Sequence, residues 1–296
     1  MSDTPVQTSA TVLTVRRVQD YHAMTLVAPA VAERFRPGQF VAVAAGGAYS
    51  ARLVRRMFGV YEVKPDYGGT VEIVFANTEP GTAWLADRSS RDRIDLVGPL
   101  GRPFRLPRDP VHCLLVGGGP GGAALFALAD TLRRRGCQIH FVLGGATGRH
   151  VFGSRMAQRV GDSAVVTTED GSTGERGTVR EVLPRVIAET GADVVYACGP
   201  TPLLRTVSRT AAEFGLPSQV SVQEFLGTTG ACGVGTCMTC VLPVHGEDGV
   251  TRMARACAEG PVLRGDRVRW GDLGTIPFDA LGAPRALGLP DGGARQ

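Results

Sequence analysis

Four cysteines near the C-terminal end could bind a metal centre, because they follow the spacing C-x4-C-x2-C-x16-C. They are Cys232, Cys237, Cys240 and Cys257. Plant-type [2Fe–2S] sites have this kind of spacing, and their thiolates hold two iron ions. Small residues and glycines separate the first two cysteines, so a tight loop can surround a cluster. Zinc sites favour repeated C-x2-C pairs, and this set contains one such pair. The spacing favours an iron–sulfur electron carrier, with zinc or buried free thiols as the alternative.

The fourth cysteine follows a predicted β-hairpin. Two β-like stretches, 240–244 and 250–254, are joined by the turn-rich segment 245–249. This hairpin would return Cys257 to the other three thiols. The remaining cysteines, Cys113, Cys137 and Cys198, have no such spacing, and we predict that they do not bind the cluster.

The composition disfavours nucleic-acid and membrane partners. The net charge is only +4, and the one basic run, at 133–135, lies at the end of a predicted helix, where cations interact favourably with the helix dipole. The uncharged stretch 113–129 is interrupted by glycines and Pro120, which predicts strand, loop and helix instead of a membrane span. The first residues show no signal-peptide pattern. We therefore expect a cytoplasmic protein.

The order of predicted elements indicates a multidomain α/β plus β protein. Short apolar runs separated by turn residues over 10–107 predict a small antiparallel β-barrel. From 111 to 220, strands alternate with helices, which predicts a Rossmann-like parallel sheet covered by helices. The cysteine module occupies 221–272, and 273–296 is expected to form a loosely packed tail.

A glycine-rich loop marks a possible nucleotide site in the α/β region. Gly117, Gly119 and Gly122 form G-x-G-x-x-G between a predicted strand and a predicted helix. Such a loop lets the backbone approach a pyrophosphate at the start of the helix, although some runs of this kind are only tight turns. The acidic residue that usually follows the next strand is missing, and Arg149 stands nearby. The choice between NAD and NADP therefore stays open.

Two further segments could contact a cofactor. Cys198, Gly199 and Pro200 end a predicted strand, at the sheet edge where such folds bind ligands, although Cys198 could equally be a buried thiol. In the barrel, Arg56 and Phe58 could hold a diphosphate and pack on a flavin. The simpler interpretation of Arg56, taken alone, is a surface arginine on an edge strand.

Taken together, these motifs resemble ferredoxin-reductase-like flavoproteins, and more closely the electron-transfer subunit of class 1B dihydroorotate dehydrogenase. The resemblance covers about 10–265. Its most specific part is the cysteine spacing, closed by the C-x-x-G-P-V segment 257–262. The other matching segments are 55–60, 98–104 and 168–174, which read R-R-M-F-G-V, G-P-L-G-R-P-F and T-E-D-G-S-T-G.

The resemblance implies FAD in the barrel, NAD(H) in the second domain and one [2Fe–2S] cluster. It further implies electron transfer to or from an FMN-containing catalytic subunit, in a heterotetramer that serves pyrimidine biosynthesis. By the same resemblance, Arg56 would contact the FAD phosphate, Phe58 and Gly59 the isoalloxazine, and Gly81 with Thr82 would form a second flavin-binding turn. No residues for binding dihydroorotate are identified, so no catalytic residue is assigned.

Two segments depart from the family pattern. Gly59 stands where the family usually has Ser or Thr near flavin N5, and the approach to Cys232 over 224–231 is longer and richer in glycine. Two alternatives therefore stay open. One is the reductase component of another complex, such as a sulfite reductase, hydrogenase or oxygenase. The other is a non-catalytic nucleotide-sensing protein with a structural metal site.

Overall fold

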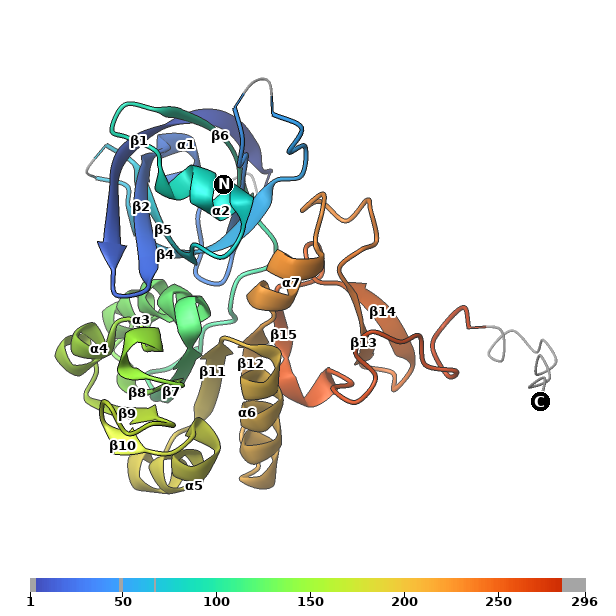
Figure 1. The fold of residues 1–296 in the computed structure, drawn as a ribbon. Helices are drawn as coiled ribbons and strands as arrows, with labels where there is room; N and C mark the ends of the chain where they lie inside the picture. Colours follow the sequence, from blue (N-terminus) through green and yellow to red (C-terminus); the bar gives the residue numbers. More distant parts are fainter. Residues whose placement is uncertain (1–3, 48–49, 67, 284–296) are drawn as a thin grey trace.

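The structure is a computed structural model that describes residues 4–47, 50–66 and 68–283. It has three parts that follow one another along the chain (Figure 1). A barrel, in blue and cyan, lies above an α/β part in green and yellow, and the C-terminal hairpin lies beside both in orange and red. None of the helices in the described ranges is long and apolar enough to cross a membrane.

The first part is the predicted antiparallel barrel. Its strands are β1 (Val6–Val18), β2 (Tyr21–Val27), β3 (Phe40–Val43), β4 (Arg56–Lys64), β5 (Thr70–Ala76) and β6 (Arg93–Leu100). They close in the order β1-β2-β5-β4-β3-β6. Alternate side chains such as Met24, Leu26 and Ile73 fill the interior, as the period of two in a strand requires. Two short helices, α1 (Pro29–Ala32) and α2 (Pro80–Ala86), lie in the connections and were not predicted.

The second part contains a sheet of seven strands in the order β10-β9-β8-β7-β11-β12-β15. Six strands run parallel, as predicted: β7 (His112–Gly118), β8 (Gln138–Gly145), β9 (Ser163–Thr168), β10 (Glu175–Arg176), β11 (Val194–Cys198) and β12 (Ser218–Ser221). The helices are α3 (Ala124–Arg134), α4 (Ser154–Val160), α5 (Val179–Thr190) and α6 (Thr201–Glu213), with 3-10 turns η1 (Gly119–Ala123) and η2 (Gly148–His150). The carboxyl ends of β7, β8 and β11 meet at one edge of the sheet.

Two helices in this part begin at other residues than their sequence suggests. The predicted helix after the glycine loop begins as the 3-10 turn η1 and becomes α-helical only at Ala124, because the glycine run bends with Gly119 at a φ of 58°. Thr201, a residue type that often caps a helix, is already the first helical residue of α6. Pro200 precedes it with an extended ψ of 147°, and its side chain forms no cap hydrogen bond.

The C-terminal part contains the predicted hairpin, β13 (Val241–His245) and β14 (Thr251–Arg255). It then returns to the α/β sheet through β15 (Val262–Arg264), which pairs antiparallel with β12, and ends in the turn η3 (Gly265–Arg267). This return was not predicted. It joins the cysteine module to the sheet by backbone hydrogen bonds, so the module is attached at both ends.

Two segments near the C-terminus are more ordered than their composition suggests. The glycine-rich approach to the cysteines forms the helix α7 (Gln223–Thr229), which in Figure 1 lies between the barrel and the hairpin. The expected loose tail is held on the hairpin as far as residue 283: Thr251 donates to Asp279, and Ala280 is fully buried. Arg269 binds the same Asp279 carboxylate, which explains why this segment stays close. The rest of the tail, 284–296, lies outside the described residues.

Candidate functional site

The cysteine loop is folded so that backbone amides surround one sulfur. Cys232 Sγ accepts hydrogen bonds from the amides of Val234, Thr236 and Cys237 at 3.3–3.4 Å. Gly233 and Gly235 make this turn possible with φ values of 74° and 83°, a region that side chains disfavour. Amides directed at a sulfur stabilise the thiolate form, which is the form that binds metal.

The four thiols form two pairs. Cys237 lies next to Cys232 in the exposed loop, and hydrogen bonds from Thr239 lower the pKa of the Cys237 thiol to about 6. The Sγ atoms of Cys240 and Cys257 are 3.4 Å apart in the buried part, where burial raises the pKa of Cys257 to about 12. Across the described residues, no three cysteine, histidine or acidic side chains are grouped for a single metal ion. Two pairs of thiols fit a cluster of two irons.

The other three cysteines are buried apart from this loop. Cys113 and Cys137 interact with each other, and burial raises the pKa of Cys113 to about 12. Cys198 is 1% exposed at the end of β11, and its pKa is also raised to about 12 by burial. A neutral, inaccessible thiol packs like a small apolar side chain.

Arg56 meets the start of α2, as the flavin interpretation requires. Its guanidinium forms a two-pronged ion pair with Glu79, with Nη2 donating to Oε2 at 2.8 Å, and Nη1 donates to Val54 O at 3.1 Å. A Cβ at Gly81 would lie 3.2 Å from Arg56 Nε, so the absence of a side chain at this position leaves room for the guanidinium. Thr82 is buried and accepts the amide of Glu79. Three of the five arginine N–H groups are used, which leaves two for a phosphate.

The next residues of β4 reach the junction of the three parts. Phe58 is half-buried and packs at 5.4 Å from the Phe75 ring. Gly59 lies where a Cβ atom would be 3.3 Å from Ala124 Cβ and 3.5 Å from Gln223 Cγ. Gly59 therefore touches both the start of α3 and the start of α7. Arg56, Phe58 and Gly59 thus lie on one strand, while Gly81 and Thr82 lie in α2.

The glycine loop lies at a cavity of about 470 Å³ at the carboxyl edge of the sheet. Two of the predicted residues line it: Gly119, in the turn after β7, and Pro200, in the turn after β11. Gly117 and Gly122 do not line the cavity but pack on each other. A Cβ added at Gly122 would lie only 3.3 Å from Gly117 Cα, so the lack of side chains at both positions lets the start of the helical segment approach the sheet. Gly199 has a φ of 152°, and a Cβ there would lie 2.9 Å from Gly118 O. The loop and the β11 turn thus form one continuous wall.

Two charged residues that line this cavity were missed by the sequence analysis. The first is Glu169, which directly follows β9, whereas the usual acidic residue of such folds follows the preceding strand, here β8. The second is Arg180, in the first turn of α5. Glu169 belongs to the segment T-E-D-G-S-T-G at 168–174, which was noted only for its resemblance to the family. Its position directly after a strand was the available signal, because ligands gather at the carboxyl ends of parallel strands.

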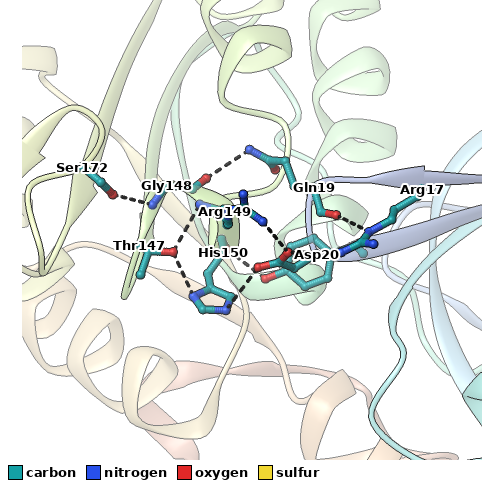
Figure 2. A network of polar contacts seen from close by, with 9 residues as sticks. Arg17, Gln19, Asp20, Thr147, Gly148, Arg149, His150 and Ser172 are labelled. Carbon is teal, nitrogen blue, oxygen red and sulfur yellow. Dashed lines mark hydrogen bonds and ion pairs between the residues drawn. The ribbon is translucent and has the colours of Figure 1, made fainter.

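A polar network joins the barrel to this cavity, between the β1–β2 turn and the loop after β8 (Figure 2). Asp20 lies 3.6 Å from Arg149 and 3.8 Å from His150, which also lines the cavity. Gln19 donates to Gly148 O at 3.0 Å across the same boundary. Arg149, considered above as a partner for a 2′-phosphate, is thus paired with a carboxylate of the barrel.

Comparison with known proteins agrees with this arrangement. Residues 230–269 match the family model described as the iron–sulfur cluster binding domain of dihydroorotate dehydrogenase B. The electron transfer subunit of dihydroorotate dehydrogenase B (NAD(+)) from Geobacillus thermodenitrificans is 35% identical over 249 residues, which cover 83% of this chain and 92% of the relative. The chain belongs to this family of electron transfer subunits. It is therefore an NAD-linked oxidoreductase component with flavin and iron–sulfur cofactors.

Two other relatives show how far the family extends. A homolog of this subunit from Thermotoga maritima is 31% identical and covers 88% of this chain and 86% of its own length. Among solved structures, an NADH-dependent reduced ferredoxin-NADP oxidoreductase that performs flavin-based electron bifurcation aligns with a TM-score of 0.76 and 29% identity. That alignment covers 89% of this chain and 91% of the other. Similar chains thus serve in more than one electron-transfer complex.

Proposed function

We propose that this chain transfers electrons between NAD(H) and an FMN-containing dihydroorotate dehydrogenase subunit, in the cytoplasm and as part of a heterotetramer. FAD would be held by Arg56, Phe58, Gly59, Gly81 and Thr82. The nucleotide would bind at the cavity lined by Gly119 and Pro200, with Gly117, Gly122, Cys198 and Gly199 shaping its wall. The cluster would be held by Cys232, Cys237, Cys240 and Cys257. FAD supplies the exchange between two-electron and one-electron chemistry, and the protein supplies position and electrostatics.

One contact supports this order of cofactors more than any other. The cysteine loop packs directly on β4, the strand that carries the flavin residues. A Cβ at Gly233 would lie 3.4 Å from Met57 Cε, and Met57 immediately precedes Phe58. A Cβ at Gly230 would lie 3.0 Å from the Met57 sulfur. The cysteine loop thus packs through Met57 on the strand that would hold the flavin, which would keep the electron path to the cluster short.

The residues of the chain have separate tasks in this proposal. Arg56 holds a phosphate through its two remaining N–H groups, and Glu79 fixes the direction of the guanidinium. Arg180 places a second positive charge at the nucleotide cavity. The amides of Val234, Thr236 and Cys237 donate hydrogen bonds to the Cys232 sulfur, and the buried Leu100 packs against the loop at Gly233 on the protein side. No described residue needs to exchange a proton with dihydroorotate.

The proposal is tested by purifying the chain anaerobically with and without the product of the adjacent gene. The chain alone should contain FAD, iron and sulfide and reduce a dye with NADH. Dihydroorotate-dependent reduction of NAD⁺ should require an FMN-containing partner. The similarity to the bifurcating oxidoreductase favours one alternative, a reductase component of another complex. Copurification with a subunit that lacks dihydroorotate activity would establish that alternative, and absence of dye reduction would support the nucleotide-sensing interpretation.

We expect the partner to bind at the exposed face of the cysteine loop. Val234 and Met238 are 57% and 51% exposed there, next to the exposed Cys237. Met238→Glu places a charge in this apolar face, so copurification with the partner should fall at least tenfold, while NADH–dye activity is retained. Leu13→Glu, at an equally exposed apolar position on β1, is the control. Equal copurification of both variants would contradict this docking face.

We expect NADH to be preferred over NADPH by at least tenfold in kcat/KM. Glu169 lines the cavity and would repel a 2′-phosphate, while Arg149 is paired with Asp20. Glu169→Gln should reduce the preference severalfold by removing the negative charge. Asp170→Asn, whose carboxylate is occupied by Ser172, is the control and should not change it. A preference for NADPH that disappears in Arg149→Ala would reverse this assignment.

A further inference from the structure

A second cavity, which the proposed function does not use, adjoins the nucleotide cavity. Its volume is about 490 Å³, close to that of the nucleotide cavity. It lies where α5 and α6 run side by side, and the segment after η3 closes one end of it. We call it the arginine cavity. A cavity of this size can enclose a ligand as large as a nucleotide.

Three arginines give the arginine cavity a positive charge. Arg180 lies in the first turn of α5, and Arg205 and Arg209 lie four residues apart on one face of α6. In the part of the chain that the structure describes, none of these guanidiniums forms an ion pair or a side-chain hydrogen bond. Among the described residues of the lining, Glu213 is the only acidic one, so three guanidiniums against one carboxylate leave a surplus of two positive charges.

The carboxylates of α5 and its surroundings are bound to other groups. Arg185, on the same helix, pairs with Glu175 at 2.7 Å and with Glu189 at 3.1 Å. Glu181, next to Arg180 in the sequence, accepts hydrogen bonds from the amide and the hydroxyl of Thr178. The charge of the arginine cavity is therefore left for an anion from outside, which guanidiniums bind through charge-assisted hydrogen bonds.

An aromatic ring completes the lining. Trp270 Nε1 donates to Gly265 O at 3.1 Å, which fixes the half-buried indole. Gly265 belongs to η3, which packs on α6 so closely that a Cβ atom at Gly265 would collide with Ser208 Oγ. Trp270 is thus held beside α6 with its N–H group already used. The group that it can offer to a ligand is the face of its ring.

We propose that the arginine cavity is a second nucleotide site, which binds a nucleoside triphosphate. The phosphates would lie among Arg180, Arg205 and Arg209, and the base would stack on Trp270. A chain of phosphates can contact several guanidiniums at once and supplies enough negative charge to neutralise the surplus. This site goes beyond the proposed electron transfer, and its ligand does not depend on the FAD site.

The two cavities have a common wall. Both are lined by Arg180, Pro202 and Thr206, whereas Arg205 and Arg209 line the arginine cavity alone. A triphosphate that engages Arg180 takes this charge away from the dinucleotide. Binding in the arginine cavity should therefore raise the KM for NADH, which makes the cavity an inhibitory site.

The test is isothermal titration of the purified holoprotein with ATP and with inorganic tripolyphosphate, without added Mg²⁺. Arg205→Ala combined with Arg209→Ala should weaken both ligands about tenfold or more, because two charge-assisted contacts are lost. Arg108→Ala combined with Arg135→Ala is the matched control, which removes the same charge from exposed positions outside the cavity. It should change either affinity by less than about twofold, because salt screens distant charges.

Trp270→Leu separates the base from the phosphates. It should weaken ATP about fivefold and leave tripolyphosphate nearly unchanged, because only ATP has a base to stack. Trp270→Phe keeps an aromatic face and should keep most of the preference for ATP. An equal loss of both ligands in Trp270→Phe, or an equal affinity of the parent for ATP and tripolyphosphate, would reject the stacking of a base and with it a nucleotide as the ligand.

The remaining outcomes are distinct. NADH–dye kinetics of the parent should show a several-fold higher KM for NADH at saturating ATP, and this rise should disappear in the double variant of Arg205 and Arg209. No binding of ATP by the parent would overturn the proposal. Equal binding by the parent and this double variant would place ATP in the nucleotide cavity and would overturn it as well. A parent chain that binds ATP but contains no FAD would instead reject the proposed function and leave this site standing.

Discussion

Cys240→Ser is expected to abolish the iron–sulfur centre while leaving FAD in place. Cys240 is 1% exposed, and its sulfur is 3.4 Å from that of Cys257, so it forms the buried half of the thiol set. A serine hydroxyl is a poor substitute for a thiolate as an iron ligand, since soft ligands favour iron–sulfur clusters. Iron and acid-labile sulfide should fall from about two per chain towards zero. The cluster's visible absorption should disappear, while the flavin bands and NADH–dye reduction remain.

The control for this experiment is another buried cysteine. Cys137 is 6% exposed and lies before β8, remote in sequence from the cysteine loop. Cys137→Ala should retain full iron and sulfide. Stoichiometric zinc and no sulfide in anaerobically purified parent protein would contradict the cluster assignment. Full iron in Cys240→Ser would remove this cysteine from the ligand set.

The sequence was sufficient for the architecture because the signals were local. Alternating strands with turns predict the barrel, and the change to strand–helix alternation predicts the parallel sheet. The hairpin β13–β14 was recognised from its turn residues. These features depend on residues a few positions apart, so a single sequence carries them.

Features that depend on distant residues could not be read in the same way. The pairing of β15 with β12 joins segments some forty residues apart, and no local pattern in Val262–Arg264 indicates its partner. The helix α7 contains Gly227 and two threonines, which disfavour helix, and it forms because Leu226 is fully buried at the domain junction. Tertiary burial outweighs weak propensity there.

The candidate site also contains features that local sequence predicts and features that depend on distant residues. The cysteine spacing predicts a four-thiol cluster site, and the structure shows these thiols as two pairs, Cys232 with Cys237 and Cys240 with Cys257. Glu169 was missed because its importance comes from a neighbouring element, since it lines a cavity formed together with α5. The pairing of Arg149 with Asp20 could not be predicted either, because Asp20 lies in the barrel, far away in the sequence.

Arg56→Ala is expected to release FAD, and the adjacent arginine provides the control. The Arg56 guanidinium lies against Gly81 with two N–H groups unused, whereas Arg55 is paired with Asp95 at 3.0 Å on the β6 strand. A charge-assisted contact to phosphate contributes about 1.5–3 kcal/mol, which corresponds to a 10- to 150-fold weaker affinity for FAD. Arg55→Ala should change the affinity by less than threefold.

The same pair of variants separates a binding role from a structural one. Glu79 would lose its partner in Arg56→Ala, so some loss of stability is expected in the absence of FAD. The thermal midpoint of the FAD-free chain measures that loss, and isothermal titration with FAD measures the affinity. Arg56→Lys keeps the charge but loses the planar fork, so its affinity should lie between those of the parent and alanine variants. If FAD binds equally well to Arg56→Ala and Arg55→Ala, the phosphate contact must be assigned elsewhere, and the ion pair with Glu79 is then the whole role of Arg56.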